Sequence, residues 1–435
     1  MVITQVKGKI ILSSAKKHKK VGAQPTAIPH SQHKISCDSI GQNALKVLHG
    51  LKDAGFEAYL VGGGVRDLLL GLHPKDFDIV TDAQPEQVRK LFRNCILIGR
   101  RFRLAHVRFG RDIVEVATFR AGAEHNSEKH KKSEHGMLLR DNVYGTIEED
   151  AWRRDFTVNA LYYRIKDHSV IDYTDGIKDL KTKTIRMLGD PLVRYREDPV
   201  RMLRAIRLAA KLGFTIEKHT AAPIKELIPL LENISPARLF EEVVKWFRSG
   251  KTLEIFNLLQ QYDLFAFLFG SAAASLKGGK HKITTAMLRH GFTNTDKRIG
   301  EGKTINPAFL YAVLLWWPVQ EQIEILCKNK NTNEFAALQQ AMQHVLKQQK
   351  IRLTIPQRLI FTIKDIWVLQ YQLTQKKKRK IYYLLAHPKF RAAYDFLLLR
   401  AQAGEPVKEL AEWWTLIQEV DETKRHEIIK EYTGE

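Results

Sequence analysis

The chain has 435 residues, 44% of them hydrophobic, and this length is too great for one compact core, so we expect roughly two to four domains. Lysine and arginine number 70 against 48 acidic residues, and the resulting net charge of +22 predicts a polyanionic partner, for which RNA, DNA and an anionic membrane surface all qualify. The sequence contains no run of about 20 apolar residues, which excludes a bilayer-spanning helix.

The three cysteines, Cys37, Cys95 and Cys327, are widely separated, and none lies in a CxxC or Cys/His ligand spacing. This pattern predicts a reducing compartment and no zinc site. The apolar run at residues 10–12 is too short for a signal-peptide core, so we expect a cytoplasmic protein.

Residues 1–35 mix Lys, Ser, Gly and Pro without periodicity, which predicts a disordered basic arm. Regular structure is expected from near Ala44, where apolar residues follow helical spacing until Gly55 supplies a C-cap. The following segments alternate between patterns typical of strands and of helices, and the last two form a hairpin about Gly110. These segments are a strand at 56–63, a helix at 65–71, a strand at 76–82, a helix at 85–92, and strands at 95–99, 104–109 and 112–119.

Residues 121–136 are polar and rich in histidine, and the five-residue spacing of the histidines predicts a mobile loop rather than a metal site. After about Asp190 the pattern is helical nearly to the end, with long amphipathic segments. A dense cation run at 376–380 directly precedes an aromatic segment at 381–390.

The segment LVGGGVRDLLLG at 60–71 places three glycines between a predicted strand and a predicted helix. Backbone N–H groups in such a turn bind phosphate, although a glycine turn alone is a weak signal. A dinucleotide-binding GxGxxG motif starting at Gly62 requires a glycine where the chain has Asp67, and the P-loop spacing is also absent. We therefore expect phosphate binding of another kind.

In the strand predicted over 76–82, Asp76 and Asp78 point to one face. Two carboxylates so close repel each other unless a cation lies between them, and Mg²⁺ prefers such oxygen ligands. An exposed acidic strand end is the alternative for an isolated DxD, but the preceding glycines and Arg66 favour a metal site. Glu115 interrupts the apolar alternation of the last predicted strand and is expected to face the aspartates. Three acids around two Mg²⁺ ions suit nucleotidyl transfer.

Four segments resemble, in the same order, the motifs of the class II nucleotidyltransferases, which comprise the CCA-adding enzymes and the bacterial poly(A) polymerases. GGGVRDLLLG followed by DFD resembles the family's head, and RRDFTVNAL at 153–161 its ribose-selecting motif. DYTDGIKDL at 172–180 resembles its flexible segment between head and neck, and REDPVRMLRAIRLAAKLGF at 196–214 its nucleobase-selecting helix.

This resemblance implies a multidomain fold of α/β and all-α parts, with a polymerase-beta-like α/β nucleotidyltransferase head followed by helical neck, body and C-terminal domains. The expected parts are an arm at 1–35, a head at 36–165 with a mobile loop at 121–136, a neck at 166–230, a body at 231–345 and a basic RNA-binding region at 346–435.

The resemblance also implies roles for individual residues. The expected catalytic acids are Asp76, Asp78 and Asp155. The expected ligands of two Mg²⁺ ions are Asp76, Asp78 and Glu115. The expected contacts to the triphosphate and ribose of the ATP substrate are Gly62, Gly63, Arg66, Arg154 and Asn159.

Base selection can also be reasoned from the side chains. Asp198 and Arg201 are three residues apart in the predicted helix and share a face. The carboxylate accepts hydrogen bonds and the guanidinium donates them, which matches the donor and acceptor of adenine and of cytosine. The pair is expected to admit ATP and CTP and to reject GTP and UTP, at about 1 to 3 kcal/mol for each buried group left unpaired. An ordinary surface ion pair is the alternative.

LIGRRFRLAHV at 97–107 resembles the segment that marks bacterial poly(A) polymerases against CCA-adding enzymes, and two further segments, at 28–36 and 235–247, agree. We therefore expect template-independent addition of AMP from ATP to RNA 3′ ends. The family implies a role in RNA turnover, contact with the RNA-degradation machinery and no membrane partner. The candidate RNA-binding residues are Lys376, Lys377, Lys378, Arg379 and Lys380, for which a merely solvated face is the alternative.

Two other functions remain open. One is a CCA-adding tRNA nucleotidyltransferase, because the base-selecting pair does not separate ATP from CTP. The other, of a different class, is a non-catalytic RNA-binding protein built on a transferase fold.

Overall fold

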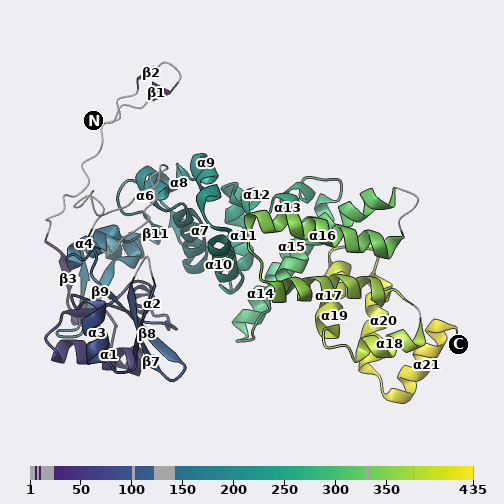
Figure 1. Cartoon of the computed structure of the whole chain (residues 1–435), viewed down its shortest axis with the longest axis horizontal. Helices are drawn as coiled ribbons and strands as arrows, with labels where there is room; N and C mark the ends of the chain where they lie inside the picture. The colour runs from purple at the N-terminus through teal and green to yellow at the C-terminus, as the bar shows by residue number, and fades with distance from the viewer. Residues whose placement is uncertain are drawn as a thin grey trace. The chain divides into compact units, whose positions relative to one another are not determined.

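The computed structural model of the chain describes residues 5–6, 9–10, 24–99, 103–121, 143–328, 333–375 and 377–434. The chain forms two compact units. Unit 1 comprises Met1–Arg201 with Phe214–Pro223, and unit 2 comprises Met202–Gly213 with Ile224–Glu435 (Figure 1).

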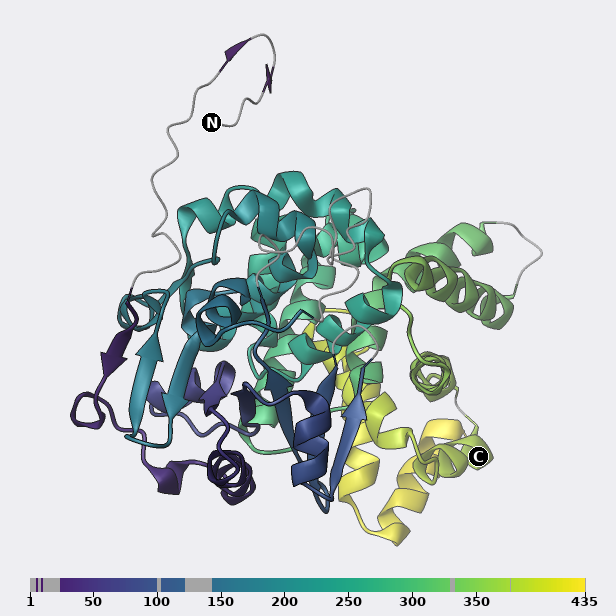
Figure 2. The ribbon, with the colours of Figure 1, turned by 60° about the vertical axis from the view of Figure 1, so that its left-hand side comes forward.

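Unit 1 is built on an eight-stranded sheet of order β3-β10-β9-β4-β5-β8-β7-β6, and several of its strands lie side by side in Figure 2. Neighbouring strands are antiparallel, except that β5 and β8 are parallel. The strands are β3 (Thr26–Ile28), β4 (Ala58–Val61), β5 (Asp78–Thr81), β6 (Cys95–Ile98), β7 (Leu104–Phe109), β8 (Asp112–Thr118), β9 (Leu161–Arg164) and β10 (Ser169–Asp172). Outside this sheet, β1 (Gln5–Val6) pairs with β2 (Lys9–Ile10), and β11 (Thr184–Ile185) pairs in parallel with β12 (Thr215–Ile216).

Short helices pack on the sheet, with α1 against β4, β5 and β8, and α3 against β6, β7 and β8. α1 buries one apolar face and ends just before Gly55, whose φ of 85° favours glycine. The helices of unit 1 are α1 (Gln42–Asp53), α2 (Gly63–Leu69), α3 (Pro85–Leu91), α4 (Ile147–Arg153), α5 (Gly176–Lys181), α6 (Pro191–Glu197) and α8 (Lys218–Ala221), with the 3-10 turns η1 (His30–Gln32), η2 (Cys37–Ser39) and η3 (Thr157–Asn159). α7 (Val200–Leu212) begins in unit 1 and lies mostly in unit 2.

One part of the core of unit 1 joins the central strands to α4. Tyr59 and Val61 of β4, Val80 of β5 and Tyr162 of β9 are buried together with Ala151 of α4. Each large apolar side chain removed from water stabilises the fold by about 1.5–3 kcal/mol. This packing fixes α4, and with it the residues that follow its C-terminal end.

The described part of unit 2 is helical. Its members after α7 are α9 (Ile224–Leu227), η4 (Ile228–Asn233), α10 (Pro236–Phe247), α11 (Thr252–Gln261), α12 (Leu264–Leu268), α13 (Gly270–Ser275), α14 (His281–Gly300), α15 (Pro307–Cys327), α16 (Glu334–Arg352), α17 (Gln357–Leu373), α18 (Lys378–Leu385), α19 (Phe390–Gln402), α20 (Lys408–Glu419) and α21 (Glu422–Thr433). The first part of α15 is buried against its neighbours, and Trp414 of α20 anchors a second core with α17, α18 and α19. Within the described ranges, no helix is both long and apolar enough to cross a bilayer.

The predicted fold class, an α/β head with helical domains after it, is confirmed, and so are the helices and strands predicted between residues 44 and 119 apart from their exact ends. The prediction of a disordered arm over residues 1–35 is wrong for its last part, because β3 pairs with β10 and extends the sheet. The head boundary at residue 165 is also wrong, because β10 belongs to the same sheet. The loop predicted at 121–136 lies, after Ala121, outside the described residues.

Candidate active site

The glycine turn between β4 and α2 lies at the centre of the candidate site. Gly62 has a φ of 72°, a conformation that favours glycine. A Cβ atom on Gly62 would lie 3.6 Å from Nη1 of Arg154, 3.9 Å from Oδ2 of Asp78 and 4.0 Å from the carbonyl oxygen of Asn159. Three predicted site residues from two segments far apart in the sequence therefore converge on this one glycine.

The predicted metal ligands lie where β5 and β8 run side by side. The parallel register places Asp78 opposite Glu115, and both side chains are exposed. Asp76 precedes β5, which begins at Asp78, so the strand predicted over 76–82 is wrong at its start. We call Asp76, Asp78 and Glu115 the carboxylate face. Across the β7–β8 pair, Nε2 of His106 lies 3.4 Å from Oε1 of Glu115.

Electrostatics within the carboxylate face are unfavourable to ionisation. Packed protein atoms raise the pKa of the Asp78 carboxyl, and the charges of Glu115 and Asp76 raise it further, while Arg154 acts in the opposite direction. In the described ranges, no three histidine, cysteine, aspartate or glutamate side chains lie close enough together to hold a metal ion. The carboxylate face is thus a concentration of negative charge that the described neighbours offset only in part.

A chain of hydrogen bonds links the glycine turn to the RRDFTVNAL segment. Arg66 is buried, and its Nη1 donates to Oδ1 of Asn159 at 2.5 Å while its Nε and Nη2 donate to Asp67. Nδ2 of Asn159 donates to Oδ1 of Asp155 at 3.0 Å, and the same oxygen accepts the N–H of Phe156. These contacts fix the side-chain amide of Asn159, whose oxygen accepts from Arg66 and whose nitrogen donates to Asp155.

Arg154 follows the C-terminal end of α4 and is held by a buried carboxylate. Its Nε and Nη2 donate to Oδ2 of Asp150 at 3.1 and 2.8 Å, and its Nε also donates to the hydroxyl of Tyr162. That hydroxyl donates in turn to Asp150 at 2.8 Å. Burial opposes the charge of the guanidinium, but Tyr162 and Asp150 hold the pKa of Arg154 above its usual range. Nη1 of Arg154, the atom nearest Gly62, takes no part in these bonds.

The predicted base-selecting helix is interrupted. α6 ends at Glu197, Asp198 has extended backbone, and α7 begins at Val200, because Pro199 lacks an N–H and disfavours helical geometry in the residue before it. The prediction that Asp198 and Arg201 share a helix face is therefore wrong, since only Arg201 lies in a helix. The carboxylate of Asp198 instead accepts the N–H of Val200, at 3.3 Å.

Arg201 is bound by groups that the sequence patterns did not indicate. Its Nη1 donates to the carbonyl oxygen of Arg194 at 2.7 Å and to Oε2 of Glu197 at 3.1 Å. The same oxygen of Glu197 accepts from Nη1 of Arg194 at 2.8 Å. Glu197 is buried and its single carboxylate pairs with two arginines at the junction of α6 and α7, so one positive charge is left over.

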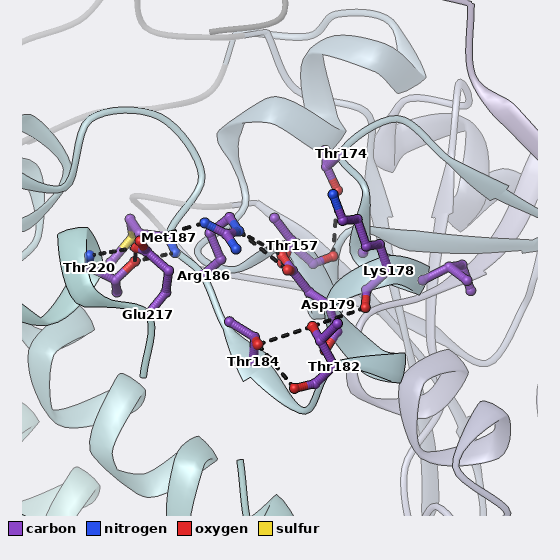
Figure 3. Close-up of polar contacts among 12 residues, drawn as sticks. Thr157, Thr174, Lys178, Asp179, Thr182, Thr184, Arg186, Met187, Glu217 and Thr220 are labelled. Atoms are coloured by element: carbon purple, nitrogen blue, oxygen red, sulfur yellow. Dashed lines mark hydrogen bonds and ion pairs between the residues drawn. The ribbon is translucent and has the colours of Figure 1, made fainter. Parts of the chain in front are cut away.

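A second buried network supports η3, the turn that ends at Asn159 (Figure 3). Oγ1 of Thr157 donates to Asp179 at 2.7 Å, and Nε of Arg186 donates to the same carboxylate at 3.1 Å. Arg186 also pairs with Glu217, which accepts from Thr220. The segment at 172–180, which resembles the family's flexible motif, is thus held through Asp179 by Thr157, which precedes it in the sequence, and by Arg186, which follows it.

The cation run at 376–380 lies in unit 2, at the start of α18. Lys376 is outside the described residues, whereas Lys377 and Arg379 are exposed and Lys378 and Lys380 are partly exposed. Tyr383, one turn further along α18, is 62% exposed, and its ring contacts His387. A large exposed aromatic side chain next to cations is typical of surfaces on which bases stack.

The structure brings most of the predicted site residues of unit 1 together and adds several that the sequence patterns missed. Gly62, Arg154, Asp78, Glu115 and Asn159 form one group, while the lysines of α18 belong to the other unit. The added residues are His106, Asp150, Tyr162, Asp179, Arg194 and Glu197. One of them had a visible signal, since Asp150 lies four residues before Arg154, a spacing that brings helical side chains together. Glu197 and Arg201 have the same spacing, but the helix is broken between them at Asp198.

Three protein-family models match separate parts of the chain. The poly A polymerase head domain matches residues 58–186, the probable RNA and SrmB binding site of polymerase A matches 213–276, and the arginine-rich C-terminus of polymerase A matches 330–435. A protein of Escherichia coli named Poly(A) polymerase I is 50% identical over 396 residues, which are 90% of this chain and 85% of that protein. A protein of the same name from Haemophilus influenzae is 48% identical over 409 residues, 93% of this chain and 90% of that one.

Similarity to CCA-adding enzymes covers less of the sequence. A CCA-adding enzyme of Lactobacillus helveticus is 42% identical over 202 residues, 46% of this chain and 49% of that protein. Among solved structures, the Bacillus stearothermophilus CCA-adding enzyme in complex with CTP superposes with a TM-score of 0.55 and 26% identity, over 85% of this chain and 80% of that one. The chain therefore resembles both poly(A) polymerases and CCA-adding enzymes, but sequence identity near 50% over about 90% of the chain is found with the poly(A) polymerases.

Proposed function

The chain belongs to the bacterial poly(A) polymerase family of class II nucleotidyltransferases, and from that premise we propose that it extends RNA 3′ ends with AMP from ATP through the group of residues around Gly62. The observation that carries the proposal is the convergence on Gly62 of Asp78, Arg154 and Asn159. A carboxylate, the Nη1 edge of a guanidinium and a backbone carbonyl around a space without a side chain suit a metal-bound nucleoside triphosphate.

The carboxylate face fits a hard divalent cation. Its donors are carboxylate oxygens, which Mg²⁺ prefers, and the pKa of Asp78 is raised by like charges that a cation would offset. Asp76 and Asp78 would hold two Mg²⁺ ions, and Glu115 would join them as a further ligand only after its side chain moves, because no three described acids lie close enough together to hold one ion. The chemistry that such ions supply is a lowered pKa of the attacking hydroxyl and neutralisation of charge on the departing pyrophosphate.

The remaining residues bind and orient the nucleotide. Arg154 presents Nη1 to the phosphates from a position fixed by Asp150, and the turn at Gly62 and Gly63 lets the triphosphate approach the backbone. Asn159, held between Arg66 and Asp155, would contact the ribose. The oxygen of the primer 3′-hydroxyl forms the bond to the α-phosphorus, the bond from that phosphorus to the bridging oxygen breaks, and pyrophosphate leaves.

Base selection and RNA binding complete the proposal. Asp198 and Arg201 read the Watson–Crick edge of adenine as acceptor and donor. The cations of α18, Lys377 to Lys380, attract the RNA backbone without regard to sequence, and Lys376 is assigned with them. We also propose, because the family implies it, that the tails promote RNA turnover, that the RNA-degradation machinery is a partner, and that the protein acts in the cytoplasm.

One experiment tests the activity. The protein is incubated with Mg²⁺ and with each nucleoside triphosphate separately, and in one further reaction with CTP and ATP together, on two primers, an unstructured RNA and a tRNA that lacks its CCA end. A long ladder with ATP alone on the unstructured RNA is the expected result. Addition of only C, C and A to the tRNA would identify a CCA-adding enzyme instead, and the absence of any incorporation would leave an RNA-binding protein.

A further inference from the structure

Arg194 of α6 contacts two segments that the proposed function uses separately. Its Nη2 donates to the carbonyl oxygen of Arg154 at 2.7 Å and to that of Arg153. Its Nη1 donates to Glu197, and its own carbonyl oxygen accepts from Nη1 of Arg201 at 2.7 Å. One arginine thereby joins the backbone that carries the phosphate-binding guanidinium to the side chain that reads the base.

We propose that Arg194 is a positioning residue that holds the base-reading Arg201 in register with the triphosphate-binding Arg154. This inference rests on the proposed function, because it concerns the two ends of one bound nucleotide. The base lies at one end of a nucleoside triphosphate and the phosphates at the other, so both ends fit only if their two binding groups keep a fixed separation.

The geometry requires an arginine at this position. A guanidinium has five N–H donors in a rigid fork, so it can donate to two carbonyl oxygens and a carboxylate at once, which an ammonium group does with much less geometric definition. The side chain of Arg194 is 12% exposed, and that of Glu197 only 7%. The contacts are therefore made largely away from water, where a lost partner is costly.

The charges around Arg194 are unusual for a purely structural link. Burial and the nearby charges of Arg201 and Arg153 lower the pKa of Arg194 to about 10, although Glu197 opposes this. Replacing a buried ion pair by apolar side chains is often neutral or stabilising, so stability alone does not explain why Arg194 and Arg201 share the one carboxylate of Glu197. Among the described residues, Nε of Arg194 is buried and has no hydrogen-bond partner.

The arrangement also leaves Arg201 available to a base. Its described hydrogen bonds all use Nη1, which is held by the Arg194 carbonyl and by Glu197. No described contact uses its Nε or Nη2, so these N–H groups remain to donate to an acceptor of the base edge. Arg194 fixes the orientation of this donor edge both directly, through its carbonyl, and indirectly, through Glu197.

α6 itself is fixed locally, which makes it a suitable carrier of Arg194. The side chain of Asp190 accepts the N–H of Leu192 as an N-cap, and Pro191 occupies the first helical position. Gly189 has a φ of 76°, and a Cβ there would lie 3.5 Å from Cδ of Arg194. The hydroxyl of Tyr195 donates to the carbonyl of Thr220 at 2.9 Å.

The test is Arg194→Lys, which keeps the charge and removes the fork. Steady-state kinetics on an RNA primer are measured with ATP and with GTP, a purine of similar size. We expect the KM for ATP to rise and the preference for ATP over GTP to fall, each about tenfold, while kcat at saturating ATP changes by less than about threefold. Glu197→Gln should also lower the preference for ATP over GTP, because it weakens the bond that holds Nη1 of Arg201 and so leaves the guanidinium less well oriented.

Arg186→Lys is the matched control. Arg186 also pairs with a buried carboxylate of unit 1, Asp179, but has no described contact with Arg201 or with the carbonyls of residues 153 and 154. It should lower the melting temperature without changing the preference for ATP over GTP. A merely structural Arg194 would behave in the same way, with equal losses for both nucleotides, and that result, or an unchanged preference, would overturn the proposal.

A binding measurement separates this inference from the proposed activity. Equilibrium dialysis of ATP and of GTP with Mg²⁺ and without primer gives the ratio of the two dissociation constants. If the wild-type protein adds no AMP, the proposed function fails, and the change of this ratio in Arg194→Lys still decides the inference. If the wild-type protein binds ATP and GTP equally, Arg201 does not read the base, and the inference fails as well.

Discussion

The carboxylate face of unit 1 groups like charges, whereas its buried ion pairs place each carboxylate against a guanidinium. Asp78 and Glu115 lie opposite each other and keep accessible surface, but many protein atoms surround the Asp78 carboxyl and displace part of its hydration, so they and its acidic neighbours raise its pKa. Asp150 is buried, yet Arg154, Arg153 and Tyr162 outweigh the cost of burial and lower the pKa of its carboxyl. One region keeps an excess of negative charge, and the other neutralises it within the protein.

This difference separates residues that bind a ligand from residues that hold others in place. Like charges that the fold leaves close together cost stability, and such sites are typical of functional groups. Buried pairs are costly to break, because removal of one partner leaves the other charge unpaired. Substitutions in the carboxylate face should therefore remove activity without loss of stability, whereas substitutions of the buried pairs should cost stability first.

The largest effect is expected for Asp78→Asn. The amide has the shape of the carboxylate but no charge to hold a cation, so AMP incorporation should fall by roughly 1,000-fold or more. The folded-state pKa of Asp78 is raised, so its ionisation costs stability as the pH rises through that pKa, and the neutral amide avoids this cost. Melting curves should show an equal or higher melting temperature at pH 8. Asp53→Asn, on the exposed surface of α1, should retain activity, and a normal ladder from Asp78→Asn would contradict the assignment.

Asp150→Asn reverses the pattern. It leaves Arg154 without its carboxylate, and the free energy of unfolding at pH 7 should fall by about 3 kcal/mol. The folded-state pKa of Asp150 is lowered, so its stabilisation is present above the unfolded value of 3.8 and is lost as the pH falls below it. Urea titrations should therefore show a smaller difference from the wild type at pH 3.5 than at pH 7. Tyr162→Phe, which removes one hydrogen bond, should cost only about 1 kcal/mol.

Gly62→Ala tests whether the space at the centre of the site is used. Gly62 and Gly71 both have a positive φ, 72° and 73°, so a Cβ strains the backbone at either position, and at Gly62 the ψ of −136° lies outside the left-handed helical region as well. Only at Gly62 does the new atom face Arg154 and Asp78, since nothing lies within 4 Å of a Cβ on Gly71. We expect the KM for ATP to rise about tenfold in Gly62→Ala alone. Equal kinetics for the two variants would show that the nucleotide does not approach this turn.

The sequence was sufficient for the local parts of this site. The glycines, the DFD carboxylates and the alternation around Glu115 are short-range patterns, and periodicity places them in or next to strands without knowledge of the fold. The break at Asp198 was also within reach, because a residue before proline disfavours a helix. The expectation of one continuous helix gave the amphipathic pattern more weight than Pro199.

Long-range partners were beyond such reasoning. The pairing of β3 with β10 joins residues about 140 positions apart, and nothing in the sequence of Thr26–Ile28 identifies its neighbour. The same holds for Arg194, whose guanidinium reaches the carbonyls of residues 153 and 154, since any backbone carbonyl is an equal acceptor. Residues that position others make contacts set by the tertiary structure, and they leave little trace in a motif.

The exposed cations of α18 extend the comparison to unit 2, with the smallest effect. Arg379 and Lys380 lie one turn before Tyr383, whose ring is 62% exposed, so cations and an aromatic surface share one side of the helix. If this side binds RNA, Tyr383→Leu should weaken the binding of an unstructured RNA about fivefold at low salt, because stacking on one base contributes roughly 1 kcal/mol, while Tyr383→Phe should bind as the wild type does. Fluorescence anisotropy with a labelled RNA measures both. Equal weakening by the two variants would assign the loss to the hydroxyl, and no weakening by either would leave charge attraction, rather than stacking, as what this exposed surface offers.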